Sequence, residues 1–303
     1  MSIREKAEIS VKESPPAGYE TVRCICGADD YSIVIEKIPS GRLVKCNVCG
    51  MHYANPRLLR LLVKDATGKD LNPEVDEDKV REPERWRKTF QFRIRKLNEH
   101  LPSRGRLLDV GCYAGFFLRA ANDDGWEAYG VEPTVGGVLY AREKLNLDVQ
   151  VGTLEEAKYE SKRFNALTLL EVIEHVPDPN SVLSEANRVL KPNGILLIET
   201  PTIKNWYYRL LKGKWRHFIS GHFWFFSEEA LSALLETHGF EPLEVLCVGR
   251  YTSVRHIVGV LNQHFRLASV IAEFVFVKLL RLGGVTLYFN FGDNMLIVAR
   301  KKS

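Results

Sequence analysis

The sequence has no secretory leader and no apolar run long enough to cross a membrane. Residues 1–16 are charged and carry no apolar core, so we expect no signal peptide, a flexible tail over residues 1–18 and a cytoplasmic protein. The strongly apolar stretch from Leu267 to Leu282 is interrupted by Glu273 and Lys278 and is too short to span a bilayer. A transmembrane protein is therefore not expected.

An excess of charge of one sign is also missing. The formal net charge of +4 is too small to demand a nucleic-acid partner. A helix with several arginines is predicted over Arg85–Leu97, but no stacking platform accompanies it, so we expect no nucleic acid. The content of 45% hydrophobic and 26% charged residues is ordinary for a folded chain of 303 residues, which leaves room for one large domain and one small one.

Cysteine is sparse, and its spacing is informative. Six cysteines without a leader favour thiols or metal ligands in a reducing compartment over disulfides. Cys24 and Cys26 form one pair, Cys46 and Cys49 form another, and a glycine follows each pair. Two turns that each present two thiolates are typical of a zinc ribbon, in which the metal supplies stability that so short a segment lacks. We therefore predict a small zinc-ribbon-like module over residues 19–56 with a structural zinc.

The first cysteine pair is irregular, which leaves alternatives open. A regular knuckle has two residues between its cysteines, but only one separates Cys24 from Cys26. One of these thiols would then fall short of the metal, with His52 as a substitute ligand, or all four thiols would stay free. Cys112 and Cys247 lie in apolar strand patterns and are predicted to be small core residues.

The central stretch of the chain runs from Arg106 to Leu118. An apolar run ends there in a turn bracketed by Gly111 and Gly115 and then resumes as a helix, which predicts the first strand, ligand loop and first helix of a Rossmann-like domain. The dinucleotide fingerprint G-x-G-x-x-G fails, because Tyr113 and Phe116 occupy its second and third glycine positions. A strand-turn-helix without a ligand is the plain alternative.

Strands and helices alternate beyond this loop, which predicts a mostly parallel α/β sheet with helices on both faces and an antiparallel last strand near Asp293–Arg300. Glu132 ends the second strand of this pattern about 20 residues past the loop, where a carboxylate can accept hydrogen bonds from both ribose hydroxyls of a nucleotide.

Several ordered motifs together resemble a known family. The stretch D-x-G-x-x-x-G from Asp109 is similar to motif I of the class I S-adenosylmethionine (SAM) methyltransferases, with Tyr113 in place of the commoner third glycine. The segments 130–133, 152–155, 171–179 and 190–194 (GVEP, GTLE, EVIEHVPDP and LKPNG) add a resemblance to the UbiG-related, ubiquinone-pathway branch of that family. This resemblance covers about residues 104–240 and implies a Rossmann-like fold with a seven-stranded sheet and methyl transfer from SAM.

The resemblance also implies the acceptor, which would be a small hydroxylated molecule such as a sugar, a glycan or a quinone-like metabolite, methylated on oxygen. The cofactor-binding residues that it implies are Asp109, Gly111, Cys112, Tyr113, Gly115, Phe116, Glu132, Pro133, Thr153, Leu154 and Leu170. A different class of function stays open, namely a zinc-ribbon interaction protein that binds SAM or a nucleotide without turnover. Tyr113 favours this alternative, whereas the acidic and histidine groups described next favour an enzyme.

Four polar residues are the candidates for catalysis. Glu171, Glu174 and His175 follow the predicted fourth strand, and His222 lies in a later loop. E-x-x-E-H followed by a distant histidine resembles the divalent-metal site of ubiquinone-pathway and small-RNA methyltransferases, which implies Mg²⁺, Mn²⁺ or Zn²⁺ beside the acceptor hydroxyl. In the alternative interpretation no metal binds, and a histidine acts as a general base or the segment only shapes the loop.

The predicted domain organisation has further parts. We expect a linker and cover helix over residues 57–103 and a methyltransferase domain over residues 104–303. Inside that domain, residues 202–226 form an aromatic lid, most of which is lid core, with one or two rings available to stack on an acceptor. Residues 251–292 form an apolar helical insertion that is buried, covers the substrate or contacts a lipid-linked acceptor.

Overall fold

The computed structural model describes residues 15–59, 83–101, 103–258, 275, 277, 280 and 282–303. Most of the predicted tail, most of the linker that precedes the cover helix and the centre of the predicted apolar insertion lie outside the described residues. Among the helices that the structure describes, none has the length and apolarity needed to cross a membrane.

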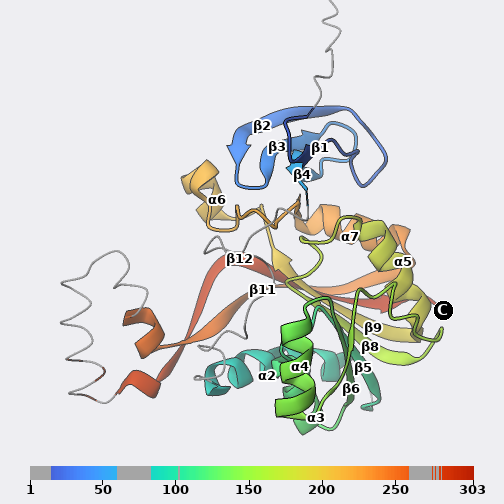
Figure 1. The fold of residues 1–303 in the computed structure, drawn as a ribbon, viewed down its shortest axis with the longest axis vertical. Coiled ribbons are helices and arrows are strands. Elements are labelled where there is room, and N and C mark those ends of the chain that lie inside the picture. Colours follow the sequence, from blue (N-terminus) through green and yellow to red (C-terminus); the bar gives the residue numbers. More distant parts are fainter. Residues whose placement is uncertain are drawn as a thin grey trace, which may run out of the picture.

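A seven-stranded sheet forms the centre of the molecule (Figure 1). Its spatial order is β11-β12-β9-β8-β5-β6-β7, in which β12 runs antiparallel to both of its neighbours and the other pairs are parallel. The fold class predicted from the sequence is therefore confirmed. The strands are β5 (Arg106–Val110), β6 (Glu127–Glu132), β7 (Asp148–Val151), β8 (Phe164–Leu170), β9 (Leu190–Pro201), β11 (Phe240–Ser253) and β12 (Thr286–Lys301).

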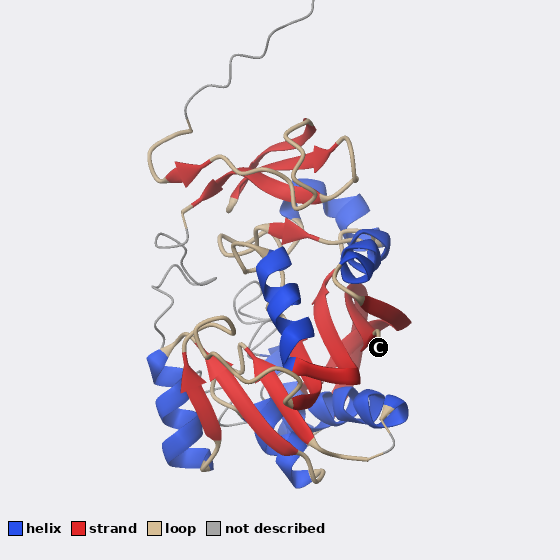
Figure 2. Cartoon of the chain, turned by 90° about the vertical axis from the view of Figure 1, so that its right-hand side faces the viewer, coloured by secondary structure: helices blue, strands red, loops and turns tan. Residues whose placement is uncertain are grey.

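Helices cover both faces of this sheet (Figure 2). The helices α2 (Pro83–His100), α3 (Phe116–Asp123) and α4 (Val135–Leu145) share one face, and α5 (Pro179–Val189) and α7 (Glu228–Thr237) pack on the other. Successive residues of a strand point to opposite faces, so Leu107 is buried in one apolar core and Leu108 in the other.

Local sequence signals set where the helices begin. Asp178 accepts a hydrogen bond from the backbone N–H of Asn180 at 3.0 Å, and Pro179 occupies the first turn of α5. Ser227 caps α7 in the same way by accepting from the N–H of Ala230 at 3.3 Å. These caps orient the loops that precede them, and both loops carry candidate site residues.

The hairpin of β11 and β12 is longer than the sequence indicated. We expected an insertion from residue 251, but β11 continues to Ser253 and β12 already begins at Thr286 (Figure 1). The expected boundaries were wrong because Arg250–Ser253 pair in register with Thr286–Phe289 and so extend the ladder. A one-turn 3₁₀ helix, η4 (Leu282–Gly284), precedes β12.

The N-terminal residues form a second, antiparallel sheet. Its strands β1 (Tyr19–Glu20), β2 (Tyr31–Ile38), β3 (Gly41–Cys46) and β4 (His52–Leu58) have the order β1-β4-β3-β2. A further strand, β10 (Trp224–Phe225), comes from the distant segment predicted as a lid and pairs antiparallel with β4. The same segment contains α6 (Trp206–Leu211) and the 3₁₀ turn η2 (Lys212–Lys214), and Figure 1 shows the small sheet above α6 and α7.

Candidate functional site

The loop after β5 has the backbone shape that its glycines allow. Gly111 and Gly115 have φ angles of 70° and 80°, in the left-handed region that favours glycine. A Cβ atom at Gly111 would lie 2.6 Å from Cγ2 of Val172, so the chain approaches the β8 loop too closely for a side chain. Tyr113 also has a positive φ, of 50°, at the position where the motif that this loop resembles commonly has a third glycine. The tyrosine therefore keeps the loop conformation that a glycine would adopt, although it pays a conformational cost.

Two carboxylates flank this loop at the carboxyl edge of the sheet. Glu132, at the end of β6, is 6% exposed and accepts hydrogen bonds from the N–H of Tyr113 and of Thr134, both at 2.9 Å. Asp109 is buried near the carboxyl end of β5 and accepts from the hydroxyl of Thr168 at 2.5 Å. Burial raises the pKa of Asp109 to about 7. The loop thus combines close-approach glycines with a carboxylate that can accept hydroxyl donors, and these features fit the ribose of SAM.

The other residues predicted to bind SAM surround this loop with different exposure. Cys112 and Leu154 are buried in the apolar cores, so their side chains face the protein interior. Phe116, Thr153 and Leu170 are half-buried, and Pro133 is exposed. Sequence alone could not distinguish core-facing members of the motif from those that can contact a ligand.

Three of the four predicted catalytic residues converge beside the end of β8. One side-chain nitrogen or oxygen atom from each of Glu174, His175 and His222 lies within 4.8 Å of the others. The two imidazole rings meet edge to face with their centroids 4.4 Å apart. His175 Nδ1 lies 2.8 Å from the carbonyl oxygen of Gly221, so Nδ1 donates this hydrogen bond.

Two buried polar atoms of this cluster have no hydrogen-bond partner among the residues that the structure describes. Glu174 is 1% exposed, and its Oε2 accepts from the hydroxyl of Thr200 at 2.9 Å, but its Oε1 has no hydrogen-bond partner. His222 is 4% exposed, and its Nδ1 has no partner either. Buried polar atoms without partners are rare because each costs desolvation free energy. A cation between them would satisfy both.

Burial shifts the pKa values of two residues of the cluster toward their uncharged forms. Burial, together with the charge of Glu171, raises the pKa of Glu174 well above its usual range. Burial and the neighbouring His175 lower the pKa of His222 well below its usual range. The protein by itself therefore favours an uncharged carboxylic acid beside a neutral imidazole. Carboxylate and neutral imidazole are a donor set that Mn²⁺ and Zn²⁺ accept readily.

Glu171 does not join the other three residues. Its Oε1 lies 2.6 Å from a guanidinium nitrogen of Arg250 and accepts from the amide of Asn294 at 2.6 Å. Although burial opposes its ionisation, Arg250 lowers the pKa of Glu171. Its backbone has a positive φ of 61°, which turns the chain sharply out of β8. Glu171 is therefore paired with Arg250, whereas Glu174, His175 and His222 form a separate group of possible metal ligands, which we call the donor cluster.

Polar residues that the sequence analysis missed complete the surroundings. Asp293 is 2% exposed and accepts from Arg216 at 2.6 and 2.9 Å, and its Oδ2 lies 3.1 Å from His217 Nε2. Although burial opposes its charge, these contacts lower the pKa of Asp293. The ring of His217 stacks on that of His222 with the centroids 6.1 Å apart. The only sequence signal was that His217 precedes His222 by five residues, because Asp293 is distant in the chain.

Most aromatic residues of the 202–226 segment are buried. Trp215, Phe218 and Phe225 form an apolar cluster with Ile38 and Leu43 of the N-terminal sheet. Trp206 is the exception in this segment, with 59% of its surface exposed. Aromatic residues were expected to fill the lid, but their packing against the N-terminal sheet was not expected. The complete predicted set is Trp206, Tyr207, Tyr208, Trp215, Phe218, Phe223, Trp224, Phe225 and Phe226.

The four N-terminal cysteines form a second donor cluster. The sulfur atoms of Cys24 and Cys49 are 3.4 Å apart, those of Cys26 and Cys46 are 3.7 Å apart, and all four lie within 4.8 Å of one another. Four sulfurs at about 2.3 Å from a tetrahedral zinc would be separated by roughly 3.8 Å, so the cluster fits this ion.

The short first knuckle still reaches this cluster. Gly27 donates its N–H to the carbonyl of Cys24 at 2.8 Å, and Gly50 donates to Cys46 at 3.0 Å. Both glycines have a positive φ, so the first turn closes one residue earlier but in the same manner. His52 is not a member of the cluster that the described residues form.

The two remaining cysteines differ from each other. Cys112 is buried at 6% exposure, as expected of a core residue. Cys247 is exposed on β11, so its prediction as a core residue was wrong. β11 is an edge strand of the sheet, and the exposed thiol of Cys247 lies 3.4 Å from Oδ1 of Asn290.

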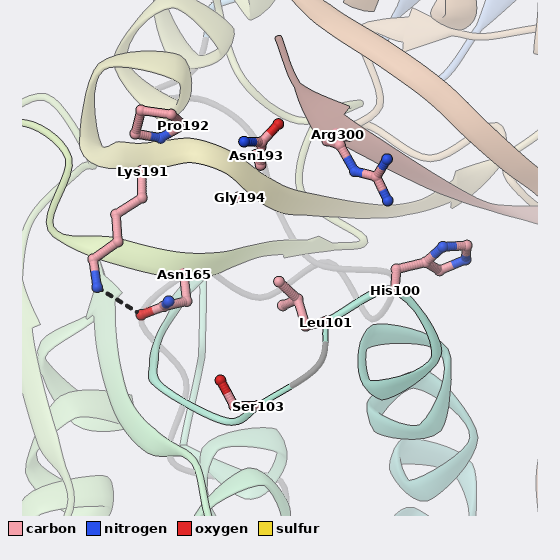
Figure 3. A pocket seen from close by; sticks show the side chains of 9 residues that line it. All are labelled: His100, Leu101, Ser103, Asn165, Lys191, Pro192, Asn193, Gly194 and Arg300. Atoms are coloured by element: carbon pink, nitrogen blue, oxygen red, sulfur yellow. Dashed lines mark hydrogen bonds between the residues drawn. The ribbon is translucent and has the colours of Figure 1, made fainter. Parts of the chain in front are cut away.

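A cavity of about 350 Å³ lies at the opposite edge of the sheet (Figure 3). Asn165 and Lys191 are the second residues of β8 and β9 there, and Arg300 lies one residue before the end of the antiparallel β12. Lys191 donates to the amide oxygen of Asn165 at 3.0 Å (Figure 3). The cysteine, glutamate and histidine clusters contribute none of its lining residues. This cavity is therefore separate from the candidate site.

Comparison with known proteins agrees with this geometry. Residues 80–245, more than half of the chain, match the family model described as a methyltransferase domain. The ubiquinone biosynthesis O-methyltransferase of Histophilus somni is 38% identical over 114 residues, which are 33% of this chain and 48% of that protein. The protein of the same name from Azorhizobium caulinodans is 31% identical over 152 residues, which are 46% of this chain and 60% of that protein. The chain thus spans about half the length of the relatives that it matches.

Solved structures show the same fold. A SAM-dependent methyltransferase from Archaeoglobus fulgidus superposes with a TM-score of 0.50 and 21% identity, covering 75% of this chain and 100% of that one. A methyltransferase complexed with the Trm112 methyltransferase activator of Haloferax volcanii gives a TM-score of 0.51 and 18% identity, covering 75% of this chain and 94% of that one. At these identities the likeness concerns the fold alone.

Proposed function

This chain belongs to the methyltransferase domain family and is a SAM-dependent methyltransferase, and we propose that it methylates a hydroxyl oxygen of a small acceptor beside a divalent cation. The observation that carries the proposal is the convergence of Glu174, His175 and His222, with two buried donor atoms left without partners. The similarity to ubiquinone biosynthesis O-methyltransferases supports oxygen as the methylated atom. Sugars, glycans and quinone-like metabolites are the acceptor classes that the proposal covers.

One group of residues would bind SAM in this reaction. Bound SAM supplies an electrophilic methyl group on a sulfonium. The loop from Asp109 to Gly115 and the carboxylate of Glu132 would hold its ribose, because Glu132 is fixed by backbone N–H groups at the switch point of the sheet. Alignment of the acceptor oxygen with the methyl carbon then accounts for much of the rate.

Glu174, His175 and His222 would hold the divalent cation. The hydrogen bond to Gly221 fixes the tautomer of His175, and the hydroxyl of Thr200 fixes the carboxylate of Glu174. A cation held in this way would lower the pKa of the acceptor hydroxyl. Glu171, which is already paired with Arg250, would balance charge nearby rather than act as a ligand.

A structural zinc in the four-cysteine cluster is the second part of the proposal. The sulfur separations, the glycine at the end of each knuckle and the position of Cys46 at the end of β3 support it.

The domain division predicted from the sequence also stays a proposal, with one amendment. The strand β10 belongs by sequence to the 104–303 domain but pairs with β4.

Metal titration tests the cation site. Protein with its cysteine cluster loaded with zinc should bind one Mn²⁺, detected by electron paramagnetic resonance, and Glu174→Gln and His222→Ala should abolish that binding. The matched control is His100→Ala, because His100 lies at the opposite edge of the sheet beside Glu244. Equal Mn²⁺ binding by the wild type and both site variants would contradict the proposal.

A further inference from the structure

The N-terminal sheet and the candidate catalytic loop share a strand. In β10, Trp224 pairs with Tyr53 and Phe225 pairs with His52 of β4. Just before this strand, the N–H of Ala54 donates to the carbonyl of Phe223 at 2.8 Å. The rings of Tyr53 and Trp224 also stack, with their centroids 5.7 Å apart. The segment that carries His222 is therefore held by the N-terminal sheet.

The same segment holds the loop that carries Glu174 and His175. The carbonyl of Glu174 accepts from the N–H of Phe223 at 2.9 Å, and the indole N–H of Trp224 donates to the carbonyl of Val176 at 2.9 Å. These contacts form a continuous path of backbone hydrogen bonds from β4 through β10 to the loop. The donor cluster is thus built on a support that residues 52–58 supply.

Arg57 of β4 contacts this loop directly. Its Nη1 donates to the carbonyl of Pro177 at 3.0 Å, and its Nε pairs with Glu20 at 2.8 Å. Its guanidinium lies over the ring of Phe223, 5.1 Å from the centroid. Arg57 is 7% exposed, so these contacts form in a largely dry environment, where they are stronger than at the surface.

Only arginine can make these contacts together. A guanidinium presents several N–H donors in a rigid plane and stacks on aromatic rings, whereas a lysine ammonium is a single point on a flexible stem. Glu20 pairs with Arg57 across β1 and β4, and its carboxylate fixes the plane of the guanidinium. The geometry makes Arg57 a rigid link between the N-terminal sheet and residue 177.

From these contacts we infer that the N-terminal sheet is a working part of the catalytic site and that Arg57 is a positioning residue for Glu174 and His175. The kinetic part of this inference rests on the proposed function. Beyond strands β1 and β4, the side chain of Arg57 contacts the carbonyl of Pro177 and the rings of Phe223 and Trp224, so its effect passes through these residues. Displacement of the loop would misplace the acceptor and leave the SAM site intact.

Hydrogen exchange and kinetics on the full-length protein test this inference together. Arg57→Met should speed amide exchange over residues 172–178, keep the zinc content and the KM for SAM unchanged, and lower kcat by roughly 10- to 100-fold, because a displacement of about 1 Å can cost that much. Arg57→Lys retains the charge beside Glu20, so its exchange over residues 172–178 and its kcat should lie between those of the wild type and of Arg57→Met. If Arg57→Met fails to fold, Arg57→Lys replaces it in every comparison. Arg42→Met is the control, since Arg42 lies in the same sheet but pairs with Glu36 in a solvent-exposed position.

The outcomes separate this inference from the proposed function. Exchange over residues 172–178 that matches the Arg42→Met control would overturn it. Faster exchange throughout residues 15–59 with loss of zinc would also overturn it, because Arg57 would then stabilise only its own sheet. If the wild type transfers no methyl group to any hydroxylated acceptor, the proposed function fails, and exchange over residues 172–178 alone then decides whether Arg57 holds the loop.

Discussion

The loop from Asp109 to Gly115, which we propose to bind SAM, has residues with positive φ angles beside two buried carboxylates. Tyr113 occupies a left-handed conformation, and its N–H donates to Glu132, so the carboxylate holds in place the one residue of the loop that departs from the glycine pattern. Asp109 lies beneath the loop with Thr168 as its hydrogen-bond partner. Both carboxylates are buried, but their partners differ, because backbone N–H groups donate to Glu132 and a hydroxyl donates to Asp109.

Substitution of Glu132 tests the ribose contact. Glu132→Gln keeps the size of the side chain but removes charge-assisted hydrogen bonds, so SAM affinity should fall by about 2 kcal/mol, or roughly 30-fold. Calorimetry measures the dissociation constant for SAM. Glu127→Gln is the control, because Glu127 begins the same strand and is exposed. An unchanged dissociation constant for Glu132→Gln would show that Glu132 does not hold the ribose of SAM.

The raised pKa of Asp109 predicts a pH dependence of stability. Since burial raises its pKa in the folded state to about 7 from about 3.8, folding favours the protonated acid, and the contribution of this residue is most favourable below pH 4. That contribution is lost as the pH rises to 7, by up to about 4 kcal/mol. In the absence of SAM, Asp109→Asn should therefore gain stability relative to the wild type as the pH is raised from 4 to 8. Parallel curves of unfolding free energy against pH would refute this.

At the scale of elements, helix α2 is tied to the main sheet by a buried ion pair. Arg93 is 1% exposed, donates to Glu199 of β9 through two nitrogens at 2.8 Å each, and donates to the carbonyl of Gly249 at 2.9 Å. The sequence predicted the helix and its apolar face, on which Ile94 and Leu97 are buried. It did not predict the ion pair, because the sequence does not show which of several arginines on a helix is buried or which acidic residue it contacts.

Removal of one member of this pair should be costly. Arg93→Met leaves Glu199 buried without its partner and should reduce the free energy of unfolding by about 3–5 kcal/mol. The exposed Arg95→Met on the same helix should change it by less than about 0.5 kcal/mol. Urea denaturation measures both. The double variant Arg93→Met, Glu199→Met should recover much of the loss, and a double variant as unstable as the single one would show that the buried charge is not the cause.

The pairing of β4 with β10 marks the limit of sequence reasoning about elements. The strands of the main sheet and their mostly parallel direction followed from alternating apolar runs and turn residues, since each element carries its own local signal. A two-residue strand at Trp224–Phe225 has no such signal, and its partner lies about 170 residues earlier. The donor residues Glu174, His175 and His222 were recognisable as a motif, whereas Arg250, His217 and Asp293 come together only through the folded sheet.

In the part of the chain that the structure describes, two sheets meet at the candidate site. The cysteine cluster lies at one end of β3, the strand β10 completes the N-terminal sheet, and the carbonyl of Glu174 accepts from that segment. A zinc-ribbon-like segment could be recognised from cysteine spacing alone. Its union with the methyltransferase domain could not, because the contacts join residues that are distant in sequence and individually unremarkable.

Loss of the structural zinc should therefore affect the whole molecule. The double variant Cys46→Ser, Cys49→Ser should contain one zinc fewer per chain by elemental analysis and should melt at a lower temperature, because metal binding contributes folding free energy. Cys247→Ser is the matched control, since Cys247 is exposed and remote from the cluster. An unchanged zinc content and melting temperature in the double variant would show that the cluster holds no structural ion.

The central claim is methylation of a hydroxyl at the cluster of Glu174, His175 and His222, and the most direct measurement is transfer of label from methyl-radiolabelled SAM to a panel of hydroxylated sugars, glycans and quinone-like compounds. We expect a methyl ether to form on one acceptor class, turnover to be lost in Glu174→Gln with SAM affinity retained, and His100→Ala to keep full turnover. Transfer at an equal rate by the wild type and Glu174→Gln, or transfer to nitrogen or carbon but not to oxygen, would contradict this claim.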